Sequence, residues 1–160
     1  MSVDIEPKAR IDGRSRMPPP LPNLIGAVAG GVCQWFWPWP IGPSPWAIAG
    51  AALALAVAVW LIVGATRALA QHRTSADPAH ESTALVATGP FAFSRNPIYL
   101  ALACLHLAIA GFFNSLWIAI ALPPAMLAVD RIVVRGEERY LEAVFGRAYL
   151  DYCAKVRRWL

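Results

Sequence analysis

The chain has 160 residues, of which 58% are apolar and 15% are charged, and its formal net charge is +4 at pH 7. Soluble domains are about 25% charged, so this composition indicates a membrane protein and leaves no room for a separate soluble catalytic domain. The basic residues lie beside apolar segments, as in the cytoplasmic loops of membrane proteins, which argues against nucleic acid as a partner. The three cysteines and three histidines show no paired or metal-ligand spacing, and we expect no metal site.

Residues 1–20 carry charges and a run of prolines without any apolar period, and we expect a disordered cytoplasmic tail. Residues 21–160 form a single membrane domain. Its first predicted span, at about 21–39, is short and ends in the aromatic cluster WFWPW. Such a cluster is typical of the aromatic belt at a membrane interface, and a ligand-stacking site is the sharper alternative.

The second predicted span, at about 46–66, has no charge over a length that crosses the hydrocarbon layer. Gly50, Ala54 and Ala58 predict a face of small residues along this span, suited to close packing against another helix.

A polar, irregular connection follows from Arg67 to Ser94. It is longer than most connections inside compact domains, and such loops are either functional or disordered. Its apolar pair Leu85-Val86 predicts that the loop folds back over the membrane face.

The stretch TGPFAFSRNPIYL, Thr88 to Leu100, joins this loop to the next apolar helix. Pro97 suits a first helical turn, and Ser94 and Asn96 can both cap a helix, so the helix is predicted to start near Pro97. Arg95 and the backbone N–H groups of that helix start suit an anion such as a carboxylate. An ordinary, well-capped loop is the alternative.

The third span, at about 98–113, and the fourth, at about 116–134, are separated only by Asn114-Ser115 and predict a tight helical hairpin. His106 stands alone on an apolar helix and is predicted to be a hydrogen-bonded packing residue.

Asp130, near the end of the fourth span, is predicted to form an interfacial ion pair with the neighbouring Arg131. Lys and Arg collect in the N-terminal tail, in the 67–95 loop and after the fourth span. Both termini are therefore predicted to be cytoplasmic, in an integral membrane protein of the kind found in the bacterial inner membrane.

The last predicted element is an amphipathic helix at about 135–154, lying on the membrane face. The predicted fold is therefore an all-α integral membrane protein with about four transmembrane helices plus this C-terminal helix. Glu137 and Glu138 begin the amphipathic helix and lie on the same side of the membrane as Arg95. Two acids placed against a helix dipole are the alternative interpretation.

Together, these clusters resemble a known family. The loop LVATGPFAFSRNPIYL, the pair Glu137-Glu138 and the run FGRAYLDY before Arg157-Arg158-Trp159 resemble the isoprenylcysteine carboxyl methyltransferase family and its bacterial relatives, a broad family that includes phospholipid methyltransferases. The resemblance extends from about Leu21 to the C-terminus. It implies a membrane methyltransferase that uses S-adenosylmethionine and a lipid or isoprenoid-type acceptor entering sideways from the bilayer.

By motif position, the resemblance implies a cofactor site between the loop and the C-terminal helix. Its cofactor-binding residues are Thr83, Ala84, Leu85, Val86, Phe91, Asn96, Pro97, Ile98, Tyr99 and Glu137. Asn96 replaces the histidine of the eukaryotic members. Their substrate-side arginine aligns with Val133, so Arg131 or Arg135 would have to serve instead. The catalytic candidates are Arg95, Glu138, Arg131 and Arg135.

Methyl transfer from a sulfonium loses positive charge, so the enzyme mainly aligns donor and acceptor and excludes water. An arginine suits a carboxylate acceptor, whereas Glu138 could take the proton of an amine. Two classes of function stay open. One is a membrane methyltransferase, acting like the isoprenylcysteine enzymes or as a phospholipid N-methyltransferase; the other is a non-enzymatic module that binds lipid headgroups or a partner.

Overall fold

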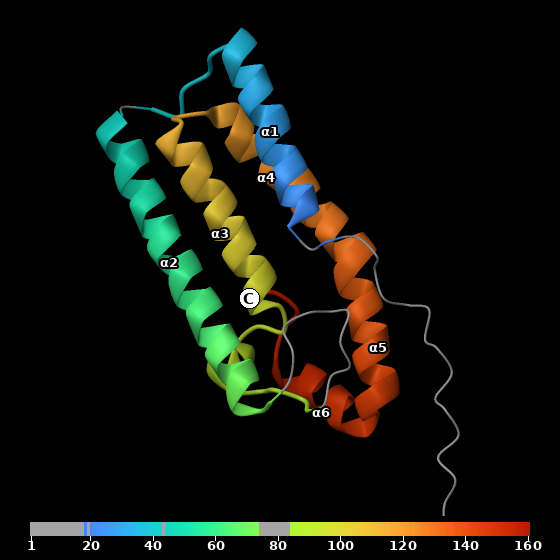
Figure 1. Cartoon of the computed structure of the whole chain (residues 1–160). Coiled ribbons are helices and arrows are strands. Elements are labelled where there is room, and N and C mark those ends of the chain that lie inside the picture. The colour runs from blue at the N-terminus through green and yellow to red at the C-terminus, as the bar shows by residue number, and fades with distance from the viewer. Residues whose placement is uncertain (1–17, 19, 43, 74–83) are drawn as a thin grey trace, which may run out of the picture.

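The computed structural model describes residues 18, 20–42, 44–73 and 84–160, and all regular secondary structure in them is helical, which confirms the all-α prediction for this part of the chain (Figure 1). The elements are α1 (Leu21–Phe36), α2 (Ser44–Gln71), η1 (Gly89–Ala92), α3 (Pro97–Phe112), α4 (Leu116–Ala128), η2 (Val129–Val134), α5 (Arg135–Phe145) and α6 (Arg147–Lys155). Of these, η1 is a 3-10 turn and η2 is a π-helix. The predicted tail lies almost wholly outside the described residues.

Helices α1 to α4 run side by side, with α2 packed along α3 and α1 along α4 (Figure 1). Small residues permit the close approach of α2 and α3, because a Cβ at Gly111 would lie 2.7 Å from the Cβ of Ala51. The predicted small-residue face is only partly correct. Ala58 is buried in it, but Gly50 is exposed with nothing near its Cβ position, since the buried stripe runs through Ala47 and Ala51 instead.

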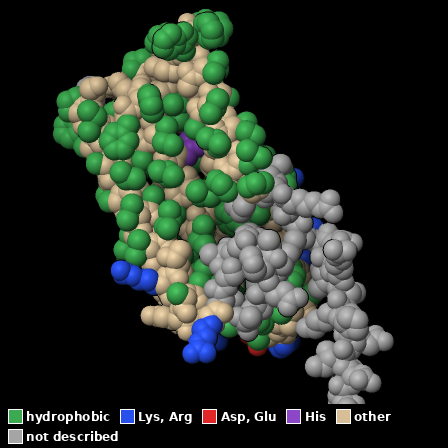
Figure 2. Space-filling view, in the orientation of Figure 1, with side chains coloured by type: hydrophobic (Ala, Val, Ile, Leu, Met, Phe, Trp, Pro, Cys, Tyr) green, Lys and Arg blue, Asp and Glu red, His purple; other side chains and the backbone are tan. Residues whose placement is uncertain are grey.

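Among the described residues, two helices are long and apolar enough to cross a membrane: α2, and the continuous helix Leu116–Phe145 made of α4, η2 and α5. Helices α1 and α3 have 16 residues each, and about 24 Å at 1.5 Å per residue falls short of the about 30 Å hydrocarbon layer. Hydrophobic side chains cover most of the described surface in Figure 2, and basic side chains gather mainly at its lower end. These features indicate a membrane protein, and crossing by α1 and α3 stays a prediction.

Two helix boundaries differ from those predicted. Helix α1 ends at Phe36 rather than Trp39, because Pro38 disfavours a helical conformation for the residue before it. Helix α2 continues to Gln71. The irregular segment therefore begins later than its predicted start at Arg67. Its last turns are supported by η1, where Pro90 packs so closely on Gly64 that a Cβ there would lie 2.7 Å from the proline Cγ.

The prediction of a single amphipathic helix at 135–154 is wrong in two ways. It has no separate start, because α4 continues through η2 into α5 without a break. It is also divided at Gly146, whose φ of +53° is a conformation that favours glycine. The break lets α6 and the residues after it return beneath the start of α3, where the C-terminus lies (Figure 1).

The two ends of the bundle are tied by polar and apolar contacts. At one end the predicted hairpin is confirmed: Asn114 has a φ of +45°, and the Oδ1 of Asn114 accepts from the backbone of Ile41 at 3.1 Å. At the other end Val86 is buried and Leu85 packs on the cluster of Tyr149, Tyr152 and Val156, as expected for a loop that folds back.

Candidate functional site

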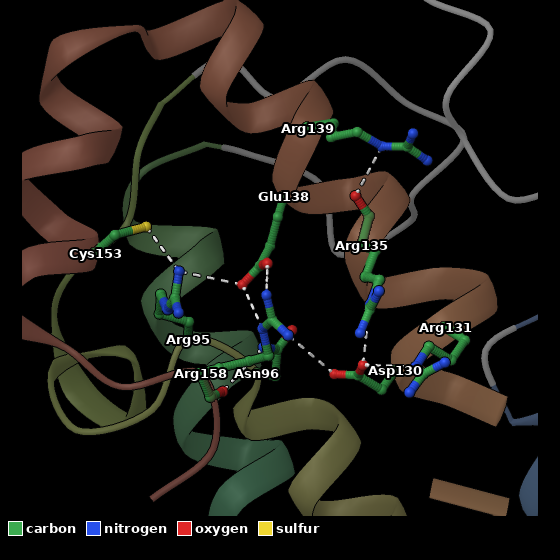
Figure 3. A network of polar contacts seen from close by, with 9 residues as sticks. All are labelled: Arg95, Asn96, Asp130, Arg131, Arg135, Glu138, Arg139, Cys153 and Arg158. Atoms are coloured by element: carbon green, nitrogen blue, oxygen red, sulfur yellow. Dashed lines mark hydrogen bonds and ion pairs between the residues drawn. The ribbon is translucent and has the colours of Figure 1, made fainter. Parts of the chain in front are cut away.

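The candidate site lies at the lower end of the bundle, where the start of α3 meets η2, α5, α6 and the C-terminal residues (Figures 1 and 3). Helix α3 begins at Pro97 as predicted, with Asn96 in the N-cap position. No side-chain cap is formed, however. The Asn96 Nδ2 instead donates to the carbonyl of Arg158 at 2.9 Å, and the Asn96 N–H donates to the hydroxyl of Ser94 at 3.2 Å. The loop before α3 is therefore held by the C-terminus as well as by its own turn.

Arg95 lies within this network. Its Nη1 is 3.1 Å from Oε1 of Glu138 and 2.7 Å from the sulfur of Cys153, and its backbone N–H donates to the carbonyl of Arg157 at 3.0 Å. Arg95 and the acidic pair were predicted to share one side of the protein, and of the two acids Glu138 contacts Arg95. The Nε of Arg95 is buried and has no hydrogen-bond partner among the described residues.

The two glutamates have different partners. The Oε1 of Glu137 accepts a hydrogen bond from the hydroxyl of Tyr99 at 2.8 Å, which joins α5 to α3. Glu138 faces Arg95 and Arg158 (Figure 3). The alternative of two acids placed against a helix dipole is wrong, because the helix does not start at these residues and both side chains make contacts with distant parts of the chain.

Arg158 is the principal residue that sequence reasoning missed. Its Nη2 lies 2.6 Å from Oε2 of Glu138, and its Nη1 lies 3.3 Å from Oδ1 of Asp130. Hydrogen bonding to Glu138 raises the pKa of the Arg158 guanidinium above its ordinary value, so Arg158 keeps its positive charge. The only sequence signal for Arg158 was the basic pair before the final tryptophan. That pair was part of the family resemblance, but no role was assigned to it.

Arg131 and Arg135 lie at the rim of the network. Their side chains are 60% and 50% exposed, and both approach Asp130, at 4.0 Å and 3.2 Å respectively. The predicted ion pair at Asp130 is confirmed, although Arg135 and Arg158 are closer partners than Arg131. Val133, which aligns with the family's arginine, is buried in an apolar cluster. A role for Arg131 or Arg135 in holding the acceptor stays a prediction.

An apolar groove of about 510 Å³ opens between α3 and α4 and reaches this network. Its volume falls within the about 300–1,000 Å³ of typical ligand sites. It is lined by Leu100, Pro123, Met126, Leu127, Asp130 and Trp159. The carboxylate of Asp130 is the one ionisable group among these, so the apolar groove meets the charged network at Asp130.

Apart from Glu137, which lies on α5, the predicted cofactor residues belong to the loop and helix start beside the network. Of them, Thr83 lies outside the described residues, Val86, Asn96, Pro97 and Tyr99 are buried, and Ala84, Leu85, Phe91 and Ile98 are half-buried. The carbonyl of Phe91 accepts from the hydroxyl of Tyr152 at 2.7 Å, which attaches this loop to α6. Burial raises the pKa of Tyr152 to about 12, so its hydroxyl keeps its proton and serves as a donor at neutral pH.

These groups match the chemistry of a charged, hydroxyl-bearing cofactor with an amino acid tail. Glu137 and Tyr99 offer a carboxylate and a phenol, Phe91 offers a half-buried ring, and Arg95 offers a buried donor without a partner. His106 lies apart from them: it is buried and bonds the carbonyl of Ile118 at 2.9 Å, which confirms its packing role. Across the described residues, His, Cys, Asp and Glu form no group of three that suits a metal.

The model of the family described as phospholipid methyltransferase matches residues 46–148, well over half of the chain and from α2 into α6. This family is the one that contains the isoprenylcysteine carboxyl methyltransferase-like membrane enzymes, so the resemblance seen in the sequence is confirmed. No curated protein and no solved structure matches the chain significantly.

Proposed function

Because this chain belongs to the phospholipid methyltransferase family, we propose that it transfers a methyl group from S-adenosylmethionine to a lipidic acceptor at the cytoplasmic membrane face. The observation that supports this most is the apolar groove between α3 and α4, which leads to the charged network beside the predicted cofactor loop. A lipid in this groove would keep its chain at membrane depth and its head at the network.

The residues that would hold S-adenosylmethionine are those of the loop and the α3 start. Glu137, held by Tyr99, suits hydroxyl groups or positive charge, and the partnerless Nε of Arg95 suits a carboxylate. When bound, the cofactor supplies an activated methyl group. The chain's own residues orient the two reactants and exclude water, and the burial of Val86, Asn96 and Tyr99 is consistent with that task.

The acceptor head would lie among Asp130, Glu138 and the arginines of the rim. Arg95 and Arg158 hold the Glu138 carboxylate in place, where it could accept a proton from an amine. The exposed Arg131 and Arg135 suit an acceptor carboxylate or phosphate. The family's description favours a phospholipid acceptor, and an isoprenylcysteine-type carboxylate is the alternative.

The position of the groove supports entry of the acceptor from the bilayer. An acceptor chain that moves from lipid into the groove gains far less than the about 0.8 kcal/mol per methylene that it would gain on leaving water. Acceptors of increasing chain length, compared at a fixed mole fraction in the lipid phase, should therefore differ little in turnover. A water-soluble acceptor without a tail that reacts as fast as the best lipid would overturn this entry route.

The function is tested by methyl-label transfer with the purified protein in detergent. Labelled S-adenosylmethionine is supplied with a total lipid extract, and the products are separated and identified. We expect saturable cofactor binding and label in a lipid fraction. A protein that binds the lipids but not S-adenosylmethionine would instead be the non-enzymatic membrane module.

A further inference from the structure

The last five residues, Val156–Leu160, form a C-terminal strap across the start of α3. The chain becomes extended at Val156, with φ −121° and ψ 129°, once α6 has ended at Lys155. Two successive carbonyls then accept hydrogen bonds from the loop before α3. The carbonyl of Arg157 accepts from the backbone of Arg95 at 3.0 Å, and that of Arg158 accepts from the amide of Asn96 at 2.9 Å.

The side chains of the strap attach it on both sides. Val156 packs with Tyr149 and Tyr152 of α6. Arg158 bridges Glu138 of α5 and Asp130 of η2, as Figure 3 shows. The strap is therefore anchored to the site through Val156 and Arg158 and is not a frayed end, although it lies outside the residues that the family model matches.

The consequence of this attachment is the position of Trp159. Its ring packs on the buried cluster of Tyr99, Val129, Val133 and Val134, and it lines the groove together with Leu100 and Asp130. Trp159 is the one aromatic residue among the groove's lining residues. It stands where the apolar lining gives way to the charged network.

A tryptophan at this boundary has a defined physical effect on a lipid. The indole offers a large rigid apolar surface with a single polar edge, and such rings prefer the level at which chain gives way to headgroup. A chain in the groove would meet this ring at the end nearest the network. The distance that the head can travel past the ring then depends on the ring's size and on how firmly the strap holds it.

We propose that Trp159 is a specificity-determining residue that sets how far the acceptor head reaches into the site, and that Arg158 is the positioning residue that holds Trp159 there. This inference rests on the proposed function. It predicts that changes at Trp159 alter which acceptors are methylated and their KM, while the affinity for S-adenosylmethionine is unchanged.

The test compares Trp159→Ala with Trp159→Phe and with Leu160→Ala, a matched control on the exposed final residue of the strap. The probe is a total lipid extract with labelled S-adenosylmethionine, and the readouts are the distribution of label among lipid species, the acceptor KM and kcat. We expect Trp159→Ala to raise the acceptor KM about tenfold and to change the product distribution. Losing apolar contacts in a pocket changes the discrimination between substrates by about this factor. Trp159→Phe should retain most of the wild-type distribution, and Leu160→Ala all of it.

Arg158→Gln should change the distribution in the same direction as Trp159→Ala, and Arg158→Lys should restore part of the wild-type pattern. The elution profile of each variant in detergent shows whether it is folded, and Trp159→Phe and Arg158→Lys provide conservative versions. An active Trp159→Ala protein with a wild-type distribution and acceptor KM would overturn this inference alone. A folded wild-type protein that labels no lipid would overturn the proposed function, and this inference with it.

Discussion

Replacing Glu138 with glutamine should destabilise the protein more than replacing Arg95 with glutamine. Glu138 is the carboxylate that two guanidinium groups share, at 3.1 Å from Nη1 of Arg95 and 2.6 Å from Nη2 of Arg158. Glu138→Gln leaves Arg95 without a carboxylate beside it and Arg158 with Asp130 alone. Arg95→Gln, in contrast, leaves Glu138 paired with Arg158.

The magnitude follows from the burial of these groups. Hydrogen bonds to charged groups contribute about 1.5–3 kcal/mol each, and loss of one partner of a fully buried pair costs about 3–5 kcal/mol. The side chains of Arg95 and Glu138 are each 16% exposed and that of Arg158 is 35% exposed, so solvent reduces these values. We expect a loss of about 2–3 kcal/mol for Glu138→Gln and about 1 kcal/mol for Arg95→Gln.

The assay is reversible unfolding in mixed detergent, with both single variants and the double variant. The double-mutant cycle should give a coupling energy above about 0.5 kcal/mol, since the two side chains are in contact. Methyl transfer measured on the same samples should show lower turnover for Glu138→Gln with S-adenosylmethionine affinity retained. An equal or larger loss of stability in Arg95→Gln would refute the conclusion that Glu138 is the shared centre of the network.

Four further outcomes are expected. Arg95→Ala should abolish methyl transfer in a folded protein, and wild-type turnover would remove this residue from the site. Glu137→Gln should mainly weaken S-adenosylmethionine binding, measured by titration, whereas a loss of stability alone would make it structural. Gly111→Ala should cost about 1–3 kcal/mol of stability through overpacking, because its Cβ would lie 2.7 Å from a neighbouring Cβ. The control Gly50→Ala should be neutral or slightly stabilising, since its Cβ would meet nothing within 4 Å. Tyr152 has a pKa raised by burial to about 12, against about 10 when unfolded, so the unfolded state loses its proton first and stability should fall as pH rises from about 10 to about 12. Tyr152→Phe should reduce that slope in unfolding measured across this range without abolishing it, because burial also raises the pKa of Tyr149.

Local patterns were sufficient for much of the helical framework. The charge-free stretch of α2, the start of α3 at Pro97 and the turn at Asn114 were all predicted from residues within one or two turns of each other. Apolar length, the missing proline N–H and the left-handed preference of asparagine are properties of the local sequence. Contacts with distant residues changed only the ends of these elements.

The structure brings together two of the predicted site residues from different motifs, although their roles stay a prediction. Arg95 and Glu138 were expected on one side of the membrane, and they form an ion pair. Their precise partners could not be predicted, since a side-chain contact depends on how two helices are rotated against each other. The same limit explains why the exposed Arg131 and Arg135 were preferred to Arg158.

The amino-acid sequence by itself determined that this is a helical membrane protein with a polar loop and an acidic pair typical of one methyltransferase family. Hydropathy and helix-breaking residues act over a few neighbouring positions, so they can be read without a structure. The tertiary structure alone decided that Gly146 turns the chain back and that Arg158 joins Asp130 to Glu138. It also placed Trp159 in the groove between α3 and α4. These contacts link the C-terminus to the start of α3, 62 residues earlier in the case of Asn96 and Arg158, and only the packing of the whole chain brings such residues together.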